Sequence, residues 1–100
     1  MRIMLKISMA VEAGNRAIKD GSLPKLMNSA MERLHPEAAY FYAEGGKRTA
    51  QMVFDMKDPS QIPSIVEPFF MGLDAEVSIT PVMNAADLKA GLEAAAKIRG

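Results

Sequence analysis

The sequence contains no cysteine and only one histidine, His35. Without cysteine, the chain can form no disulfide, no thiolate nucleophile and no cysteine-based metal site. A zinc site built by the protein alone is also unexpected, because such sites draw mostly on histidine and cysteine side chains. We therefore expect a protein with no bound metal and no cofactor.

The sequence has no net charge either, since twelve basic residues balance twelve acidic ones. Its longest basic run is Lys47-Arg48, which offers no patch for nucleic-acid phosphates or an anionic membrane. No uncharged apolar segment approaches the ~18 residues that a membrane span needs. Lys6 and Glu12 interrupt the apolar N-terminal stretch too early for the hydrophobic region of a signal peptide. We expect a cytoplasmic protein without a nucleic-acid or membrane partner.

The composition is that of one globular domain spanning residues 1–100. This length suits a single hydrophobic core, and 49% apolar with 24% charged residues is ordinary for such a protein. No internal repeat or linker divides the chain. Nine methionines are many for this length, and several fall at core spacing, which favours core filling over a pliable binding surface.

Two alternating runs, residues 37–44 and 47–56, flank Gly45-Gly46. A Gly-Gly pair at this place is typical of a β-hairpin, because both central turn residues need a positive φ. The turn fixes the register, and the register fixes which side chains share a face. One face then carries Ala39, Phe41, Ala43, Ala50, Met52 and Phe54, and the other carries Tyr40, Tyr42, Thr49 and Gln51.

The residues before the hairpin predict a strand and two helical pieces. Residues 2–9 alternate as a strand with one buried and one mixed face. A short helix follows, with Asn15 as its cap, and Ser22 can cap a second helix. The second helix ends at His35, because the residue before a proline is pushed out of the α region.

The residues after the hairpin predict a helix, a strand and a last helix. Residues 58–61 have the form of a capped helix start. Pro68 should kink or divide the apolar helix that follows, and Gly72 should end it. Residues 76–82 alternate as a strand, and Asn84 can cap a helix that runs to about Ile98.

The order of these elements predicts an α+β fold of the ferredoxin-like βαββαβ type with an extra C-terminal helix. The right-handed crossover rule places the first and third strands at the centre of a four-stranded antiparallel sheet. The two long helices should cover the sheet face that carries Ile3, Leu5, Ile7, Phe41, Met52, Phe54, Val77 and Ile79.

The opposite face of the sheet, here called the open face, mixes apolar and polar side chains. An exposed apolar patch of this kind marks an interaction site. We favour a homodimer in which the open faces of two chains meet across a two-fold axis. The face carries Met4, Lys6, Ser8, Ala38, Tyr40, Tyr42, Thr49, Gln51, Val53, Glu76, Ser78 and Thr80.

Two other interpretations of the open face remain. RNA-recognition modules of the same topology stack bases on aromatic residues of the two central strands. Here Tyr40 and Tyr42 lie on an edge strand and the charge is balanced, which disfavours RNA. Alternatively, the C-terminal helix covers the open face of a monomer, although Leu88 and Leu92 form only a thin apolar stripe for that purpose.

Five segments of the chain carry a resemblance to known proteins, namely residues 15–21, 36–41, 46–50, 53–63 and 67–70. Through them, nearly the whole chain resembles a group of uncharacterised small bacterial proteins of the dimeric α+β barrel superfamily. This resemblance implies the same ferredoxin-like fold and a dimer, but it transfers no catalytic residue. Members of the wider superfamily include small isomerases, cofactor-independent monooxygenases and haem-degrading enzymes, and fold alone does not choose among them.

Several open-face side chains could hold a ligand. Tyr40 and Tyr42 supply hydroxyl groups, Gln51 an amide and Ser8 a further hydroxyl. Lys6 supplies a cation, which would hold its proton more weakly if the face were desolvated. The alternative for Lys6 is a simple ion pair with a glutamate, either Glu44 or Glu76.

Two further candidates lie outside the open face. Arg48 and Asn15 could hold a small carboxylate, because arginine forks onto carboxylates with two hydrogen bonds. The alternative is that Arg48 pairs at the surface with Glu44 or Glu37. His35 is the one residue of the type that most often moves protons at physiological pH, but its place at a helix end favours a structural role over catalysis or haem ligation.

The sequence does not determine a function. The leading hypothesis is a homodimeric α+β barrel protein that holds a small organic or anionic ligand. The first alternative is a cofactor-independent enzyme acting on a small oxygenated substrate, with Tyr42, Lys6 or His35 moving protons. The second alternative is a purely structural or partner-binding subunit.

Overall fold

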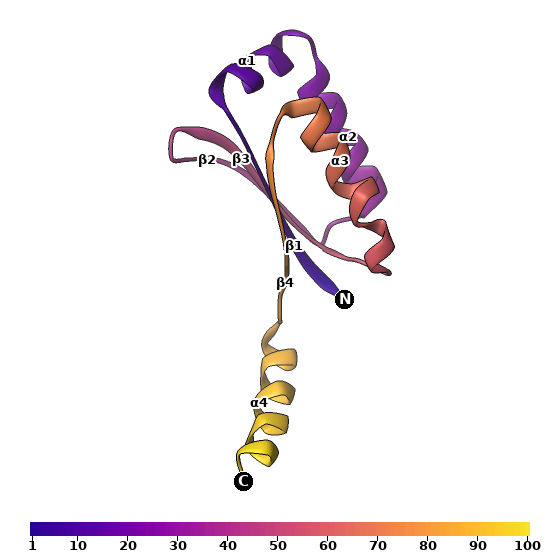
Figure 1. Ribbon diagram of the computed structural model, residues 1–100, viewed down its shortest axis with the longest axis vertical. Helices are drawn as coiled ribbons and strands as arrows, with labels where there is room; N and C mark the ends of the chain where they lie inside the picture. The colour runs from indigo at the N-terminus through magenta and orange to yellow at the C-terminus, as the bar shows by residue number, and fades with distance from the viewer.

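The computed structural model describes residues 1–100 and contains one antiparallel sheet with the strand order β2-β3-β1-β4 (Figure 1). The predicted ferredoxin-like α+β fold is confirmed, as is the central place of the first and third strands. Right-handed crossovers leave few other arrangements for this order of elements. The strands are β1 (Arg2–Met9), β2 (Ala38–Glu44), β3 (Lys47–Asp55) and β4 (Glu76–Pro81).

The predicted hairpin joins β2 and β3. Gly45 and Gly46 have φ values of 59° and 77°, which residues other than glycine rarely adopt. The register places Tyr40 opposite Gln51 and Tyr42 opposite Thr49, as the sequence predicts. The hairpin therefore sets the two tyrosines on the open face.

Three helices cover the other face of the sheet (Figure 1). Gly21 has a φ of 80° and separates the first helix from the second. Asn15 and Ser22 are not caps, because the first helix begins at Val11 and the second contains Ser22. The helices are α1 (Val11–Lys19), α2 (Ser22–Leu34) and α3 (Ile62–Leu73), the last preceded by the short 3-10 helix η1 (Pro59–Gln61).

Two predicted helix starts are confirmed by reciprocal hydrogen bonds. At η1, the Asp58 side chain accepts from the backbone N–H of Ser60, while the Gln61 side chain accepts from the N–H of Asp58. Asn84 caps the last helix in the same way, with Asp87 as its partner. Pro68 does not divide α3, which continues to Leu73.

The core lies between the sheet and helices α1 to α3. Alternate residues of β1 are almost completely buried, and α3 supplies Phe69 and Leu73 from above them. Each fully buried aliphatic or aromatic side chain contributes about 1.5–3 kcal/mol relative to exposure. The largest side chains with less than 2% exposure are Ile3, Leu5, Ile7, Met52, Phe54, Phe69 and Leu73.

The prediction that Phe41 belongs to the core is wrong. Phe41 points to the helix-covered side of the sheet, yet 60% of it is exposed. The strand β2 is an edge strand, and the helices leave the inner side of its distal half uncovered. Val77 and Ile79, on the other edge strand, are only partly buried for the same reason.

The last helix, α4 (Ala85–Arg99), projects away from the body along the longest axis (Figure 1). None of its residues is buried, and the molecule measures 57 × 28 × 19 Å. A hydrogen-bonded ion pair of 3.3 Å joins Arg2 to Asp87 near its start. The interpretation in which α4 covers the open face is therefore wrong.

None of the helices combines the length and apolar character that crossing a membrane requires.

Candidate functional site

The open face presents two rows of side chains across the strands. One row runs from Tyr40 through Gln51 to Lys6, and the next runs from Tyr42 through Thr49 to Ser8. Tyr40 and Tyr42, on the edge strand, are 68% and 38% exposed, whereas Thr49 on the neighbouring strand is buried and Ser8 on β1 is partly buried. The structure thus brings five of the predicted ligand-binding residues, Lys6, Ser8, Tyr40, Tyr42 and Gln51, to one surface.

The polar groups of the open face are partly satisfied by one another. The Tyr42 hydroxyl donates a hydrogen bond of 3.1 Å to Gln51 Oε1. The Gln51 amide nitrogen lies against the sulfur of Met4. These contacts hold the Tyr42 ring and the Gln51 amide in fixed orientations, whereas the hydroxyl of Tyr40 has no hydrogen bond within the chain.

Lys6 is held by a carboxylate. Its Nζ lies 2.6 Å from Glu44 Oε2, which confirms the alternative of a simple ion pair. The hydrogen bond to Glu44 raises the pKa of Lys6 above its ordinary value, and partial desolvation opposes this only in part. The weaker hold on its proton was expected only for a desolvated face, and in the single chain the ion pair with Glu44 decides the direction of the pKa shift. A second ion pair joins Lys47 Nζ to Glu76 Oε1 at 3.8 Å, so the two other charges at this end of the open face also balance each other.

On the other side of the sheet, Phe41 borders a hollow that we call the hairpin groove. It lies between the hairpin and the first two turns of α2, and its volume is about 290 Å³. Most of its lining is apolar, as expected where the three covering helices do not reach the full width of a four-stranded sheet. The groove is lined by Met9, Leu23, Met27, Phe41, Tyr42, Arg48, Thr49 and Ala50.

The structure brings Arg48 and Asn15 together beside this groove. Arg48 Nη1 donates a hydrogen bond of 3.0 Å to Asn15 Oδ1. Pairing of Arg48 with Glu44 or Glu37 is wrong, because Glu44 binds Lys6 and Glu37 binds Arg2 at 2.6 Å. The guanidinium of Arg48 therefore has no carboxylate partner.

Gly14 makes room for the Arg48 side chain against helix α1. A Cβ atom at residue 14 would lie 2.7 Å from Arg48 Nη1, closer than real Cβ contacts come. Glycine in a helix interior costs about 1 kcal/mol relative to alanine. The close approach of the guanidinium gives this glycine a structural purpose, and the sequence alone shows no sign of it.

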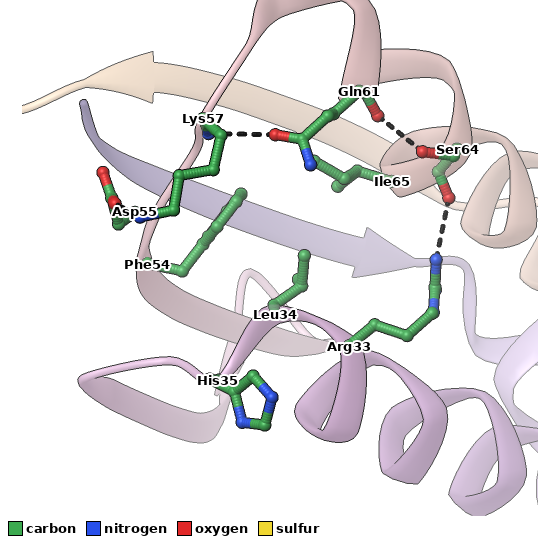
Figure 2. A pocket seen from close by; sticks show the side chains of 9 residues that line it. All are labelled: Arg33, Leu34, His35, Phe54, Asp55, Lys57, Gln61, Ser64 and Ile65. Atoms are coloured by element: carbon green, nitrogen blue, oxygen red, sulfur yellow. Dashed lines mark hydrogen bonds and ion pairs between the residues drawn. The ribbon is translucent and has the colours of Figure 1, made fainter.

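His35 lies beside a separate cavity of about 470 Å³ near the end of α2 (Figure 2). It ends the helix in the left-handed conformation, with a φ of 46°, and its backbone N–H donates to Met31 O. In Figure 2 its ring stands apart from the hydrogen bonds that connect Arg33, Ser64, Gln61 and Lys57. The predicted position of His35 at a helix end is confirmed.

Asp55 in the same cavity accepts from Lys57 and from the N-terminal ammonium, and these bonds lower its pKa from 3.8 to about 2. A carboxyl whose folded-state pKa is depressed stabilises the fold above its unfolded pKa, and this contribution is lost as the pH falls toward the folded value. We expect Asp55→Asn to lower the urea midpoint at pH 6 and to have progressively less effect between pH 4 and pH 2. Equal effects at pH 6 and pH 2 would contradict this assignment.

No protein-family model matches this chain, and no curated protein matches it. The site is therefore judged from its geometry. Lys6, Tyr42 and His35, the predicted proton-transfer groups, are not joined by any hydrogen bond or ion pair. No group of three histidine, aspartate or glutamate side chains is placed to hold a metal ion.

Sequence reasoning missed the hairpin groove. Leu23 and Met27 of α2 carry no sequence signal of a groove, and the alternation of β2 predicts Phe41 as a buried residue. The available signal was the position of β2 at the sheet edge, where the covering helices leave inner side chains exposed. The chain therefore offers two candidate surfaces: the half-polar open face, and the apolar hairpin groove with Arg48, which has no carboxylate partner, beside it.

Proposed function

We propose that this chain works as a homodimer of the dimeric α+β barrel type that holds a small organic or anionic ligand. The resemblance to small bacterial proteins of that superfamily supports the proposal. The observation that carries it is the sheet face that no element of the chain covers, while α4 stands clear of the body.

The open face suits contact with a second copy of itself. Its centre carries Met4 and Val53, partly buried, and Tyr40 at its edge exposes most of its ring. Its cations, Lys6 and Lys47, are each paired within the chain. Little uncompensated charge would therefore be desolvated when two such faces meet.

Helix α4 supports the same assembly. A helix of this length without tertiary packing is marginal in water, because most helical stability in proteins comes from a buried face. Leu88 and Leu92 are 46% and 61% exposed and lie four residues apart, on one side of α4. Since α4 directly follows the edge strand β4, it can reach a second chain that sits on the open face.

The ligand half of the proposal is supported by the hairpin groove. The groove combines an apolar lining with a cation that no carboxylate neutralises. Ligand sites are commonly apolar hollows with a few polar groups that fix orientation. Apart from Tyr42 and Thr49, which belong to the open face, the lining of the groove lies on the helix side of the sheet, so dimerisation through the open face leaves most of the groove accessible.

Light scattering on the purified protein, followed by native mass spectrometry, tests both halves. We expect a solution mass of twice the chain mass of 10.9 kDa. Gentle ionisation should then show the dimer with additional mass from a co-purified small molecule. A single chain at high concentration contradicts the dimer, and a dimer that binds no small molecule contradicts the ligand.

A further inference from the structure

Arg48 is the only partly buried basic residue of the chain without a carboxylate within 4 Å. Four basic side chains are partly buried, namely Arg2, Lys6, Lys47 and Arg48. The first three each have a carboxylate within 4 Å, and Arg48 has none. A partly desolvated cation without a counter-charge is costly, so this position suits an anion from outside the chain.

The Arg48 guanidinium is held in place before any ligand arrives. Its Nη1 donates to Asn15 Oδ1 at 3.0 Å, and Gly14 lets it lie against α1. A guanidinium has five N–H donors in a planar fork. One contact to Asn15 leaves the other donors free, which is enough for the two parallel hydrogen bonds that a carboxylate accepts.

The surface next to Arg48 is apolar. Arg48 lies on β3 two residues before Ala50, on the same side of the sheet, and is paired with Met9 of β1. Beyond them, Leu23 and Met27 of α2 face Phe41 across the hairpin groove. The volume of about 290 Å³ is close to the lower end of the range of about 300–1,000 Å³ for ligand pockets, so the occupant must be small.

We propose that the hairpin groove binds a small carboxylic acid with an apolar body, an aryl or branched aliphatic carboxylate, whose carboxylate pairs with Arg48. The apolar body fills the space between α2 and Phe41. Asn15 and Gly14 position the guanidinium. This inference rests on the ligand half of the proposed function and names its chemistry.

An NMR titration of the full-length, ¹⁵N-labelled protein tests the proposal with phenylacetate as the probe. We expect phenylacetate to shift the backbone amides of the groove residues and to bind at least tenfold more tightly than two matched probes. Acetate carries the carboxylate without the apolar body, and 2-phenylacetamide carries the ring without the charge. Equal binding of phenylacetate and 2-phenylacetamide would overturn the role of Arg48.

Three variants assign the binding to Arg48. Arg48→Gln should weaken phenylacetate binding at least tenfold, because hydrogen bonds to charged groups are among the stronger ones. Arg48→Lys should recover only part of the loss, since an ammonium cannot fork onto a carboxylate. Gly14→Ala should also weaken binding, because the added Cβ displaces the guanidinium. Lys25→Gln, an exposed change on α2, is the control and should leave the affinity unchanged.

Light scattering of the same samples reports whether each sample is a dimer, and the pattern of probe binding separates the carboxylate proposal from the ligand half of the proposed function. If phosphate or 2-phenylacetamide binds while phenylacetate does not, the carboxylate proposal fails and the ligand half of the proposed function survives. If none of the probes binds, the carboxylate proposal fails, whereas the ligand half of the proposed function fails only if native mass spectrometry also shows no co-purified small molecule. If α4 of the partner chain fills the groove, amides of α4 will shift in place of those of the groove, which also overturns the proposal.

Discussion

Tyr40→Glu is expected to convert the homodimer into a monomer. Tyr40 lies on the open face and is 68% exposed within the chain, so the substitution should not unfold the monomer. In the dimer its carboxylate would be buried without a partner, which costs about 3 kcal/mol or more. Because 1.4 kcal/mol corresponds to a tenfold change, the dimer Kd should rise by more than about 100-fold. Sedimentation equilibrium measures this Kd.

Phe41→Glu is the matched control for this substitution. Phe41 is the next residue on the same edge strand, is 60% exposed, and points to the opposite side of the sheet. Both variants replace an aromatic residue of β2 by glutamate, so the β-propensity of the strand changes equally. The two variants differ only in the sheet face that receives the charge. We expect Phe41→Glu to remain dimeric and to lose phenylacetate binding. Loss of the dimer in Phe41→Glu alone would place the interface on the helix side and contradict the proposal.

Replacing Leu88 and Leu92 together by alanine is expected to weaken the dimer without changing the stability of the isolated chain. Neither residue is buried within the chain, so the core does not depend on them. If both pack on the second copy, their burial contributes about 1.5–3 kcal/mol each. The dimer Kd should therefore rise about 100-fold or more.

The control for α4 is the double variant Lys89→Ala and Glu93→Ala. These residues belong to the same helix and are exposed, and alanine preserves helix propensity in both variants. We expect their removal to leave the Kd within a few-fold of the wild-type value. An unchanged Kd in the leucine variant would show that α4 has no part in the interface.

The fold was predictable because local signals and topology agreed. Gly45-Gly46 requires positive φ values, which fixes the hairpin register and therefore the placement of Tyr40 and Tyr42. The handedness of crossovers then fixes the strand order. The caps Asp58 and Asn84 were readable because their partners lie three residues away in the sequence.

The errors concern contacts between segments that are distant in the sequence. Alternation predicts the side on which Phe41 points, but it does not predict how far the helices extend over that side. A cap fixes where α4 begins, but its direction depends on what it packs against, and the chain itself offers α4 no such surface.

The surroundings of Arg48 show the same limit at the level of one side chain. Glutamates near it in the sequence or on the hairpin were the expected partners, but each is taken by another cation. Asn15 reaches Arg48 only because the chain reverses between β1 and α1 and brings the helix over the end of β3. Sequence spacing carries no information about that meeting.

An isotope-filtered nuclear Overhauser experiment tests the central claim most directly. Equal amounts of ¹³C-labelled and unlabelled chains are mixed, so that only contacts between two different chains are observed. We predict intermolecular signals from the Tyr40 ring and the Val53 methyl groups, both on the open face. Intermolecular signals confined to α2 and α3, or none at millimolar concentration, would contradict a dimer joined through the uncovered sheet.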